Sequence, residues 1–484
     1  MPRSLWSGIE SRKIIMRIVV EGALTLQTPA HFGNGDTDDL TDMPLLVDPL
    51  DGKTPLLTGT SIAGALRSYL REREHGYGHL ASKQSASVLL FGGRKSEDDG
   101  EQSPLVIDDM LGKNFGIEMR DGVRLDGKTR TASDKAKFDL QLWQAGTMFT
   151  LRFELLIRET DDTNRLKQAL ATALSGFNDG GITLGARKRR GYGRVQVSQW
   201  RVKTYDLTKS SGLLDWIERG DRPLDSVTPQ PDIQKALGIA KLINDHRQSF
   251  CINATFSLDG SLLIRSGGGQ DDRGPDMVHL HARQANGNKK PILSGTSLGG
   301  ALRARALKIA NTLDTSNRTQ ALINDVFGVE IRPGIQPSAS RISVQEHVVQ
   351  NARIDLVQNR VSIDRFTGGA RDTALFNEQP AFGDDSTTVT IELHLGNPKP
   401  YEIGLLLLLL KDLWTGDLPL GGESSVGRGR VKGKTSTLVY QTGGTPLQWK
   451  IVANGKNLTI TDGDEAILEG YATALNKHLK GVVA

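Results

Sequence analysis

The sequence predicts an α+β protein that contains two copies of one domain. Thr58–Arg67 (TGTSIAGALR) returns as Ser294–Arg303 (SGTSLGGALR), 236 positions later. At nearly the same shift, Leu-Phe-Gly (90–92) returns as Val-Phe-Gly (326–328), and Gly-Tyr-Gly-Arg (191–194) as Gly-Arg-Gly-Arg (427–430). Strand-type and helix-type segments follow one another in the same order in both copies. A repeat of this length indicates a duplicated domain rather than a solenoid unit.

Length and composition agree with this organisation. A chain of 484 residues has room for two or three domains, each with its own core. The single cysteine, Cys251, excludes an internal disulfide, and the first residues lack the apolar run of a signal peptide, so we expect a cytoplasmic protein. The most apolar run, Leu405–Leu410, is too short to cross a membrane and predicts a buried helix. A net charge of +4 permits nucleic-acid binding without proving it.

The first module is expected to span residues 1–204. Its β-branched start, 14–20, predicts a strand, and the glycine- and aspartate-rich stretch 31–42 predicts a loop. A helix capped by Thr60 or Ser61 follows, with Ile62 and Leu66 on its apolar face. The polar stretch 122–139 predicts a projecting hairpin, 148–157 an alternating strand, 164–174 a helix, and 180–193 a glycine-rich loop.

The rest of the chain divides into three parts. Residues 205–248 contain three prolines between helical stretches and are interpreted as a linker. The second module, 249–440, repeats the order of elements of the first. Residues 441–484 have no counterpart between the modules and predict a short strand pair and a final helix.

The glycine-rich loops are candidate phosphate-binding elements. Glycines allow backbone N–H groups to approach an anion closely, and arginines bind phosphate oxygens in a bidentate manner. A single such loop is more often a solvated basic turn, but its return in the second module favours a nucleic-acid contact. The candidate residues are Arg187, Arg189, Arg190, Arg194, Arg428 and Arg430.

The Gly-Thr-Ser helices are the second candidate element. A capped helix start offers unpaired N–H groups to phosphate, and an arginine on the same helix adds a positive charge. An ordinary capped amphipathic helix explains either copy alone. The candidate RNA-binding residues are Thr60, Ser61 and Arg67, with Thr296, Ser297 and Arg303 in the second copy.

The acidic loops supply the candidates for chemistry. An Asp-Met pair recurs at a shift of 234, so that Asp42 matches Asp276 and His31 matches Arg265. Carboxylates beside a phosphate-binding surface repel nucleic acid unless they hold a metal or accept a proton. The other aspartates of these loops are more simply explained as solvated turn residues.

The order of these motifs resembles the RAMP superfamily. An aspartate in a glycine-rich loop comes first, then Pro55-Leu-Leu-Thr-Gly-Thr-Ser61 opening a helix, then a hairpin and a final glycine-rich loop. Within that superfamily the chain is similar to backbone subunits of type III CRISPR effector complexes. Two modules in one chain resemble the tandem backbone subunit of fused type III-D effectors.

The resemblance implies a fold and an activity. Each module would be ferredoxin-like and related to the RRM fold, with an inserted thumb β-hairpin. The protein would hold a CRISPR RNA guide, alongside other subunits of the complex and away from membranes. Each thumb would displace one nucleotide of a complementary target RNA. A loop aspartate with Mg²⁺ or Mn²⁺ would then promote cleavage, which makes Asp42 and Asp276 the candidate catalytic and metal-binding residues. The thumb candidates are Asp126, Phe138, Asp364 and Phe376.

The chain also departs from the family pattern. Ala63 and Gly299 stand where the family usually has a lysine, and Arg265 replaces the family histidine that His31 matches. Two alternatives remain at this stage. The chain is a structural RNA-binding subunit whose aspartates do not cut, or a RAMP-type endoribonuclease that processes the guide precursor. The second is disfavoured because no histidine recurs between the modules.

Overall fold

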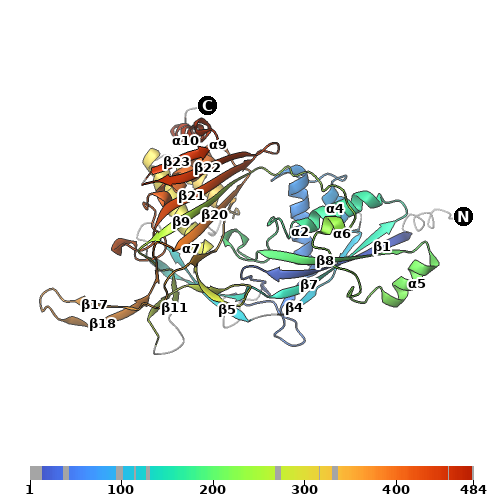
Figure 1. The fold of residues 1–484 in the computed structure, drawn as a ribbon, viewed down its shortest axis with the longest axis horizontal. Helices are drawn as coiled ribbons and strands as arrows, with labels where there is room; N and C mark the ends of the chain where they lie inside the picture. Colours follow the sequence, from blue (N-terminus) through green and yellow to red (C-terminus); the bar gives the residue numbers. More distant parts are fainter. Residues whose placement is uncertain are drawn as a thin grey trace.

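The structure is a computed structural model of the full chain (Figure 1). It describes residues 13–35, 43–93, 102–113, 116–126, 131–267, 274–314, 317–329, 336–455 and 457–481.

The first module is built on an antiparallel sheet in the order β2-β4-β7-β1-β8, with β3 also paired to β7. Alternate residues of β7, from Phe149 to Ile157, are buried, as the period of a half-buried strand requires. The strands are β1 (Ile14–Leu26), β2 (Leu56–Leu57), β3 (Leu105–Ile107), β4 (Met110–Lys113), β7 (Met148–Arg158) and β8 (Val195–Asp206).

Helices α2 (Gly59–His75) and α4 (Thr163–Ser175) cover one face of this sheet, and α3 (Ala86–Phe91) packs against both (Figure 1). Thr58 caps α2 by accepting a hydrogen bond from the Ser61 N–H, so the cap lies two residues before the expected one. The order β1-α2-β4-β7-α4-β8, with β1 between β7 and β8, is the ferredoxin-like arrangement.

The second module repeats this arrangement. Its strands run in the order β13-β14-β16-β20-β9-β21-β22-β23, with β15 paired to β20. Helices α7 and α9 take the places of α2 and α4. The elements are β9 (Ser249–Asp259), β13 (His281–Arg283), β14 (Lys289–Leu293), α7 (Gly295–Leu313), α8 (Asn317–Phe327), β15 (Ile342–Val344), β16 (His347–Gln350), β20 (Thr388–Gly396), α9 (Pro400–Trp414) and β21 (Arg430–Gln441). The predicted α+β fold of two tandem ferredoxin-like modules is confirmed.

Each module has its own hydrophobic core. One core draws its buried residues from between Ile18 and Leu237, and the other from between Phe250 and Leu479. The segment between the repeats carries α5 (Ser210–Arg219) and α6 (Ile233–Ala236), and α6 joins the first core. This segment is therefore packed against the first module rather than extended between the two.

The C-terminal residues complete the second module. Strands β22 (Leu447–Asn454) and β23 (Asn457–Asp462) extend its sheet beyond β21. Helix α10 (Glu465–Lys480) packs along α9, where the rings of Tyr401 and His478 stack 3.7 Å apart. Because α9 lies between the sheet and α10, its run of leucines is buried, as the sequence predicts. Within the described residues, no helix is long and apolar enough to span a membrane.

Both thumb hairpins are present. β5 (Ile117–Leu125) pairs with β6 (Ala132–Trp143), and β17 (Gln358–Ile363) pairs with β18 (Ala370–Gln379). The second hairpin extends away from the rest of the molecule (Figure 1). It belongs to a small sheet with β11 (Arg265–Gly267) and β12 (Met277–His279), while β10 (Ser261–Leu262) pairs with β19 (Ala381–Phe382).

The two modules make a buried contact. Arg120 on β5 of the first module binds Glu346 of the second through two hydrogen bonds of 2.6 and 3.1 Å. Both side chains are 4% exposed. A second contact involves the 3₁₀ turn η1 (Lys188–Arg190), which packs against the start of α7. A Cβ on Gly295 would lie 2.3 Å from the Arg190 carbonyl oxygen, so only glycine permits this approach.

Candidate nucleic-acid interface

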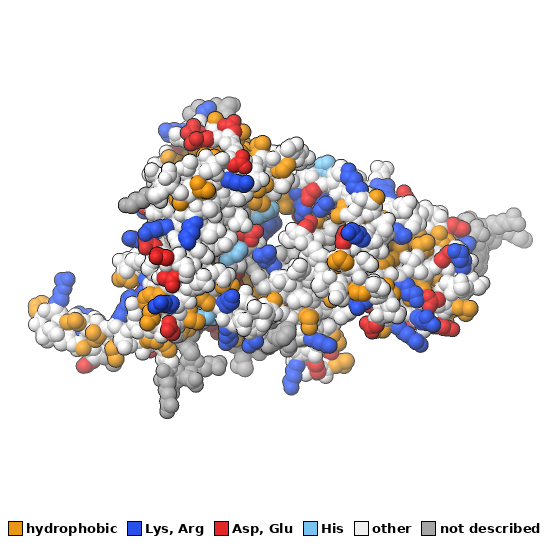
Figure 2. All heavy atoms as spheres, in the orientation of Figure 1, with side chains coloured by type: hydrophobic (Ala, Val, Ile, Leu, Met, Phe, Trp, Pro, Cys, Tyr) orange, Lys and Arg blue, Asp and Glu red, His pale blue; other side chains and the backbone are white. Residues whose placement is uncertain are grey.

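A cavity of about 1460 Å³ lies between the modules. We call it the inter-module cavity. Its first-module wall contains predicted RNA-binding residues from three separate segments: His31 from the first loop, Thr60 and Ser61 from α2, and Arg189 and Arg194 from the glycine-rich loop. Its second-module wall is formed by strands β9 and β20, including His394. Figure 2 shows the hollow between the two halves of the molecule, with basic and histidine side chains at its edge.

Glycines hold the two loops of the first module together. The Ala186 N–H donates to the His31 carbonyl at 2.9 Å, and the Gly193 N–H donates to the Pro29 carbonyl at 2.9 Å. Gly193 has a φ of +71°, and a Cβ there would lie 1.8 Å from the Leu184 carbonyl oxygen. The glycine spacing in the sequence thus reflects close loop packing, which presents the intervening basic residues beside the helix start.

The basic residues of this loop lie close to one another. Burial lowers the pKa of Lys188, and the neighbouring Arg189 lowers it further. Burial and then Arg303 of the second module lower the pKa of Arg190, whose Nη1 has no hydrogen-bond partner among the described residues. The repulsion between these cations is relieved by an anion of high charge density, such as a phosphate backbone.

His31 is held inside the loop rather than presented on the surface. Its ring is 3% exposed, and Nδ1 lies 2.9 Å from the carbonyl oxygen of Gln141 on β6. Burial lowers the pKa of His31, and Arg187 lowers it further. The His31 ring is therefore neutral, and it joins the first loop to thumb strand β6.

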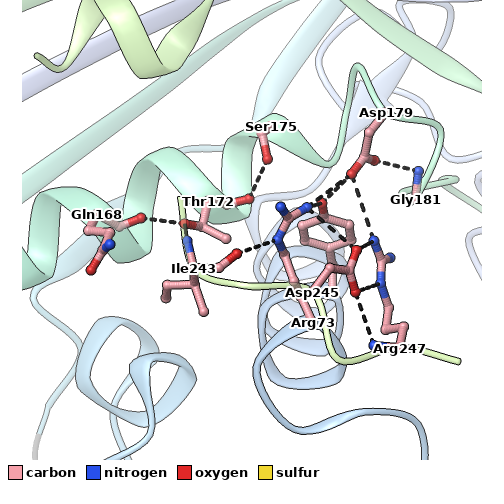
Figure 3. A network of polar contacts seen from close by, with 10 residues as sticks. Arg73, Gln168, Thr172, Ser175, Asp179, Gly181, Ile243, Asp245 and Arg247 are labelled. Atoms are coloured by element: carbon pink, nitrogen blue, oxygen red, sulfur yellow. Dashed lines mark hydrogen bonds and ion pairs between the residues drawn. The ribbon is translucent and has the colours of Figure 1, made fainter. Parts of the chain in front are cut away.

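A polar network fixes the edge of the cavity (Figure 3). Arg73 of α2 donates to the Tyr69 hydroxyl at 2.8 Å and to the Ile243 carbonyl at 2.9 Å. Arg247 binds Asp245 at 2.6 Å and lies 4.6 Å from the centre of the Tyr69 ring. Asp179 is 3.4 Å from Arg73 and 3.8 Å from Arg247. These contacts attach the segment that leads into the second module to the helix that lines the cavity.

The matching loop of the second module has a different charge. Glu423 occupies the position of Arg187, and both have a left-handed backbone, with φ of 59° and 55°. Arg428, only 3% exposed, binds Glu423 at 2.8 Å and Glu378 at 2.9 Å, while Arg265 lies 3.4 Å from Glu423. Burial and the adjacent Glu423 raise the pKa of Glu378. Two of the predicted RNA-binding arginines, Arg265 and Arg428, are thus engaged by carboxylates in this structure.

The helix arginines have the same internal partner in both modules. Arg67 donates to the carbonyl of Gly92 at 2.9 Å, and Arg303 donates to the carbonyl of Gly328 at 2.7 Å. The recurring Phe-Gly pair ends the next helix, and the arginine binds the carbonyl oxygens left unpaired there. This placement favours a structural role for the two arginines over an RNA contact.

The remaining candidates of the second module lie at its surface. Thr296 and Arg430 are exposed, and the Ser297 N–H donates to the Ser294 hydroxyl that caps α7. The start of α7 faces η1 of the first module. The two Gly-Thr-Ser helices therefore have different surroundings, and only the first opens into the inter-module cavity.

Of the two candidate catalytic aspartates, Asp276 can be placed, whereas Asp42 lies outside the described residues. Asp276 is exposed, at the start of β12 and against thumb strand β18. Met43 and Met277, which follow the two aspartates, both pair in parallel with the inner thumb strand of their module, at Leu140 and Glu378. The structure thus gives Met43 and Met277 equivalent places, as the shift of 234 predicts.

No group of three or more His, Cys, Asp or Glu side chains gathers at one point within the described residues. A divalent cation held at Asp276 would therefore need further ligands from a bound RNA. Mg²⁺ accepts such a site, because it commonly takes one or two carboxylates together with substrate phosphates and water.

The four thumb candidates lie on the two hairpins. Phe138 lies across Gly122, with the Arg187 guanidinium 4.3 Å from its ring centre, and Phe376 is 39% exposed. Asp126 and Asp364 lie at the inner ends of the two turns. Hydrogen bonds from the backbone N–H groups of Thr367 and Phe366 lower the pKa of Asp364. The same two hydrogen bonds fix the turn, in which the Phe366 side chain is fully exposed.

Sequence reasoning missed several residues of the site. Lys188 and Arg247 line the cavity, Phe366 forms the tip of the second thumb, and Asn377 contacts Asp276. Lys188 lay inside a recognised motif. Nothing in the sequence marks Arg247 or Asn377, because their contacts join segments far apart in the chain.

Comparison with known proteins agrees with the repeat. A family model described as the RAMP superfamily matches the chain twice, over residues 23–196 and 255–432. A search of curated proteins finds no match.

Proposed function

This chain belongs to the RAMP superfamily of CRISPR-associated RNA-binding proteins, and on that premise we propose that it is a tandem backbone subunit of a type III effector complex. In this role it holds a CRISPR RNA guide and cleaves the complementary target RNA, with one site in each module. The observation that carries the proposal is the inter-module cavity, which brings together the first loop, the start of α2 and the basic glycine-rich loop.

The chemistry of the cavity suits an RNA backbone. Burial and then the neighbouring Arg189 lower the pKa of Lys188, and Thr60 and Ser61 at the start of α2 line the same cavity. Contacts of this kind bind phosphates without reading sequence, which suits a subunit whose specificity comes from base pairing. The second module contributes less to binding of the RNA backbone, because Arg428 is paired with carboxylates.

The thumb hairpins support the second part of the proposal, which is cleavage of the target RNA. Phe366 at the hairpin tip and Phe376 on β18 are exposed apolar rings on an extended hairpin. Such a wedge separates stacked bases at a cost of about a few kcal/mol, repaid by ring stacking and backbone contacts. A displaced nucleotide has its 2′-hydroxyl free to align with its own phosphate.

Cleavage then follows by transesterification. The 2′-oxygen forms a bond to phosphorus, the P–O5′ bond breaks, the 2′-hydroxyl proton is lost, and the departing O5′ takes up a proton. A bound Mg²⁺ or Mn²⁺ would neutralise charge on the phosphate oxygens. Asp276, and Asp42 in the first module, would hold that ion beside the scissile phosphate, and the thumb would hold the in-line geometry.

Guide binding tests the first half of the proposal. Replacing both Lys188 and Arg189 with glutamate is expected to weaken guide RNA binding and to reduce its dependence on salt concentration. Each lost phosphate contact lowers the slope of log K against log salt by about 0.7 for single-stranded RNA. Lys308→Glu, an exposed change on α7 outside the cavity, is the control. Equal salt slopes for all three proteins would contradict the assignment of the cavity.

A subunit that binds RNA without cutting is the second candidate. The lack of a preformed multi-ligand metal site among the described residues favours it. The two candidates share the cavity and differ only in whether the aspartates act.

A further inference from the structure

We propose that Asn377, on thumb strand β18, is a positioning residue for the Asp276 carboxylate. This inference rests on the proposed role of Asp276 in target cleavage. It assigns to one residue, through its side-chain Oδ1 and its backbone N–H, the task of coupling the thumb to the site of cleavage.

Asn377 and Asp276 form a reciprocal pair of hydrogen bonds. The Asp276 N–H donates to Asn377 Oδ1 at 2.7 Å, and the Asn377 N–H donates to Asp276 Oδ2 at 2.9 Å. The first bond fixes the backbone of the aspartate, and the second fixes its carboxylate. No described residue donates a hydrogen bond to Asp276 Oδ1, so the pair directs this oxygen to the exposed side.

The pair also joins the aspartate to the thumb. Residues 277 and 278 form parallel pairs with Glu378 and Gln379 of β18. Glu378 is buried and anchored by Arg428 at 2.9 Å and Arg360 at 3.3 Å. On the other side of Asn377, Phe376 is exposed where a displaced base would lie. Three consecutive residues therefore contact the RNA, hold the aspartate and anchor the strand.

This geometry couples movement of thumb strand β18 to movement of Asp276. A displacement of β18 by bound RNA moves Asn377, and Asp276 moves with it because both of its hydrogen-bonding groups are engaged. The carboxylate thus keeps its place relative to the nucleotide that the thumb displaces. Enzyme sites depend on such placement, since misplacement by about 1 Å costs about a hundredfold in rate.

An amide suits this position better than a carboxylate. Asn377 Oδ1 accepts the Asp276 N–H without adding a negative charge beside Asp276. An aspartate in its place would keep the acceptor but add a second negative charge beside Asp276. The matching residue on the first thumb strand is Asp139, so of the two modules the second is the one with an amide side chain at this position.

The test uses the assembled complex with guide and a complementary target labelled at one end. Single-turnover rates are measured for the second-module cut, and the first-module cut in the same reaction serves as the internal reference. The variants are Asn377→Ala, Asn377→Asp and Asp276→Ala. The matched control is Asn359→Ala, the cross-strand neighbour of Asn377 on β17, since Asp276 forms its hydrogen bonds with Asn377 and not with Asn359.

We expect Asn377→Ala to slow the second-module cut by about threefold to tenfold, the effect of one lost hydrogen bond. Target affinity and the first-module cut are unchanged. Asn377→Asp keeps an acceptor for the Asp276 N–H and recovers most of the rate.

Two results overturn the inference while leaving the proposed function standing. One is an Asn377→Ala rate equal to that of Asn359→Ala, in a complex where Asp276→Ala removes the cut. The other is an equal loss of rate for Asn377→Ala and Asn377→Asp. If the second-module cut persists in Asp276→Ala, the cleavage role of Asp276 is itself wrong, and the inference falls with it.

Discussion

Replacing Arg120 with methionine removes the central cation of the buried contact between the modules. Arg120 binds Glu346 at 2.6 and 3.1 Å and Glu118 at 2.5 Å. Methionine has a similar length and no charge, so the change leaves two carboxylates buried without a cation. Breaking a buried ion pair in this way costs about 3–5 kcal/mol. Glu346→Gln leaves Arg120 paired with Glu118 and is expected to cost about 1–3 kcal/mol.

The stability lost in the Arg120→Met variant should depend on pH. Burial already raises the pKa of Glu118, and Arg120 opposes this rise. Without Arg120, nothing opposes the rise in the pKa of Glu118 above the unfolded value of about 4.3, so the folded state binds more protons than the unfolded state. The stability of Arg120→Met is therefore lowest at neutral pH and recovers as pH falls toward that unfolded value.

Urea unfolding at pH 7 and pH 5 measures both effects. Lys137→Met is the matched control, because its ion pair with Asp121 lies on the same hairpin and is exposed. Surface pairs of this kind contribute less than about 1 kcal/mol. The reasoning is refuted if Arg120→Met costs no more than Glu346→Gln, or if its cost is the same at both pH values.

Three further predictions concern the second module and the metal. Arg428→Met should cost about 1–3 kcal/mol in urea unfolding, because Glu378 and Glu423 lose one cation and keep Arg360; an unchanged midpoint would contradict the ion cluster. Phe366→Ala should change stability by less than about 0.5 kcal/mol, since the ring is fully exposed. It should also lower the fluorescence of 2-aminopurine placed opposite the second thumb, and an unaltered signal would remove the wedge role. Chelation of divalent cations by EDTA should stop target cleavage and leave guide binding intact; cleavage that survives chelation would exclude the metal.

The repeat was visible in the sequence because it follows from packing. Alternate residues such as Phe149 and Leu151 face the core of β7, and glycines such as Gly193 stand where a Cβ would meet backbone. These requirements are local and recur in both modules. Motif order therefore predicted the sheets, the helices, both hairpins and the equivalent places of Met43 and Met277.

The internal partners of the arginines could not be predicted in the same way. Arg67 and Arg428 were assigned to RNA because their type and motif suited phosphate, yet their partners are a helix end and two carboxylates. Sequence gives the residue type but not the direction in which a side chain points. The contact between Asn377 and Asp276 spans 101 positions, and no local pattern marks it.

Target cleavage by the assembled complex tests the central claim most directly. Wild type, Asp42→Ala, Asp276→Ala and the double variant are each assembled with guide RNA and given an end-labelled complementary target with Mg²⁺. The account predicts that each single variant loses one distinct cut while target binding persists, and that the double variant loses both. The same set of cuts from all four complexes would show that these aspartates do not cleave RNA.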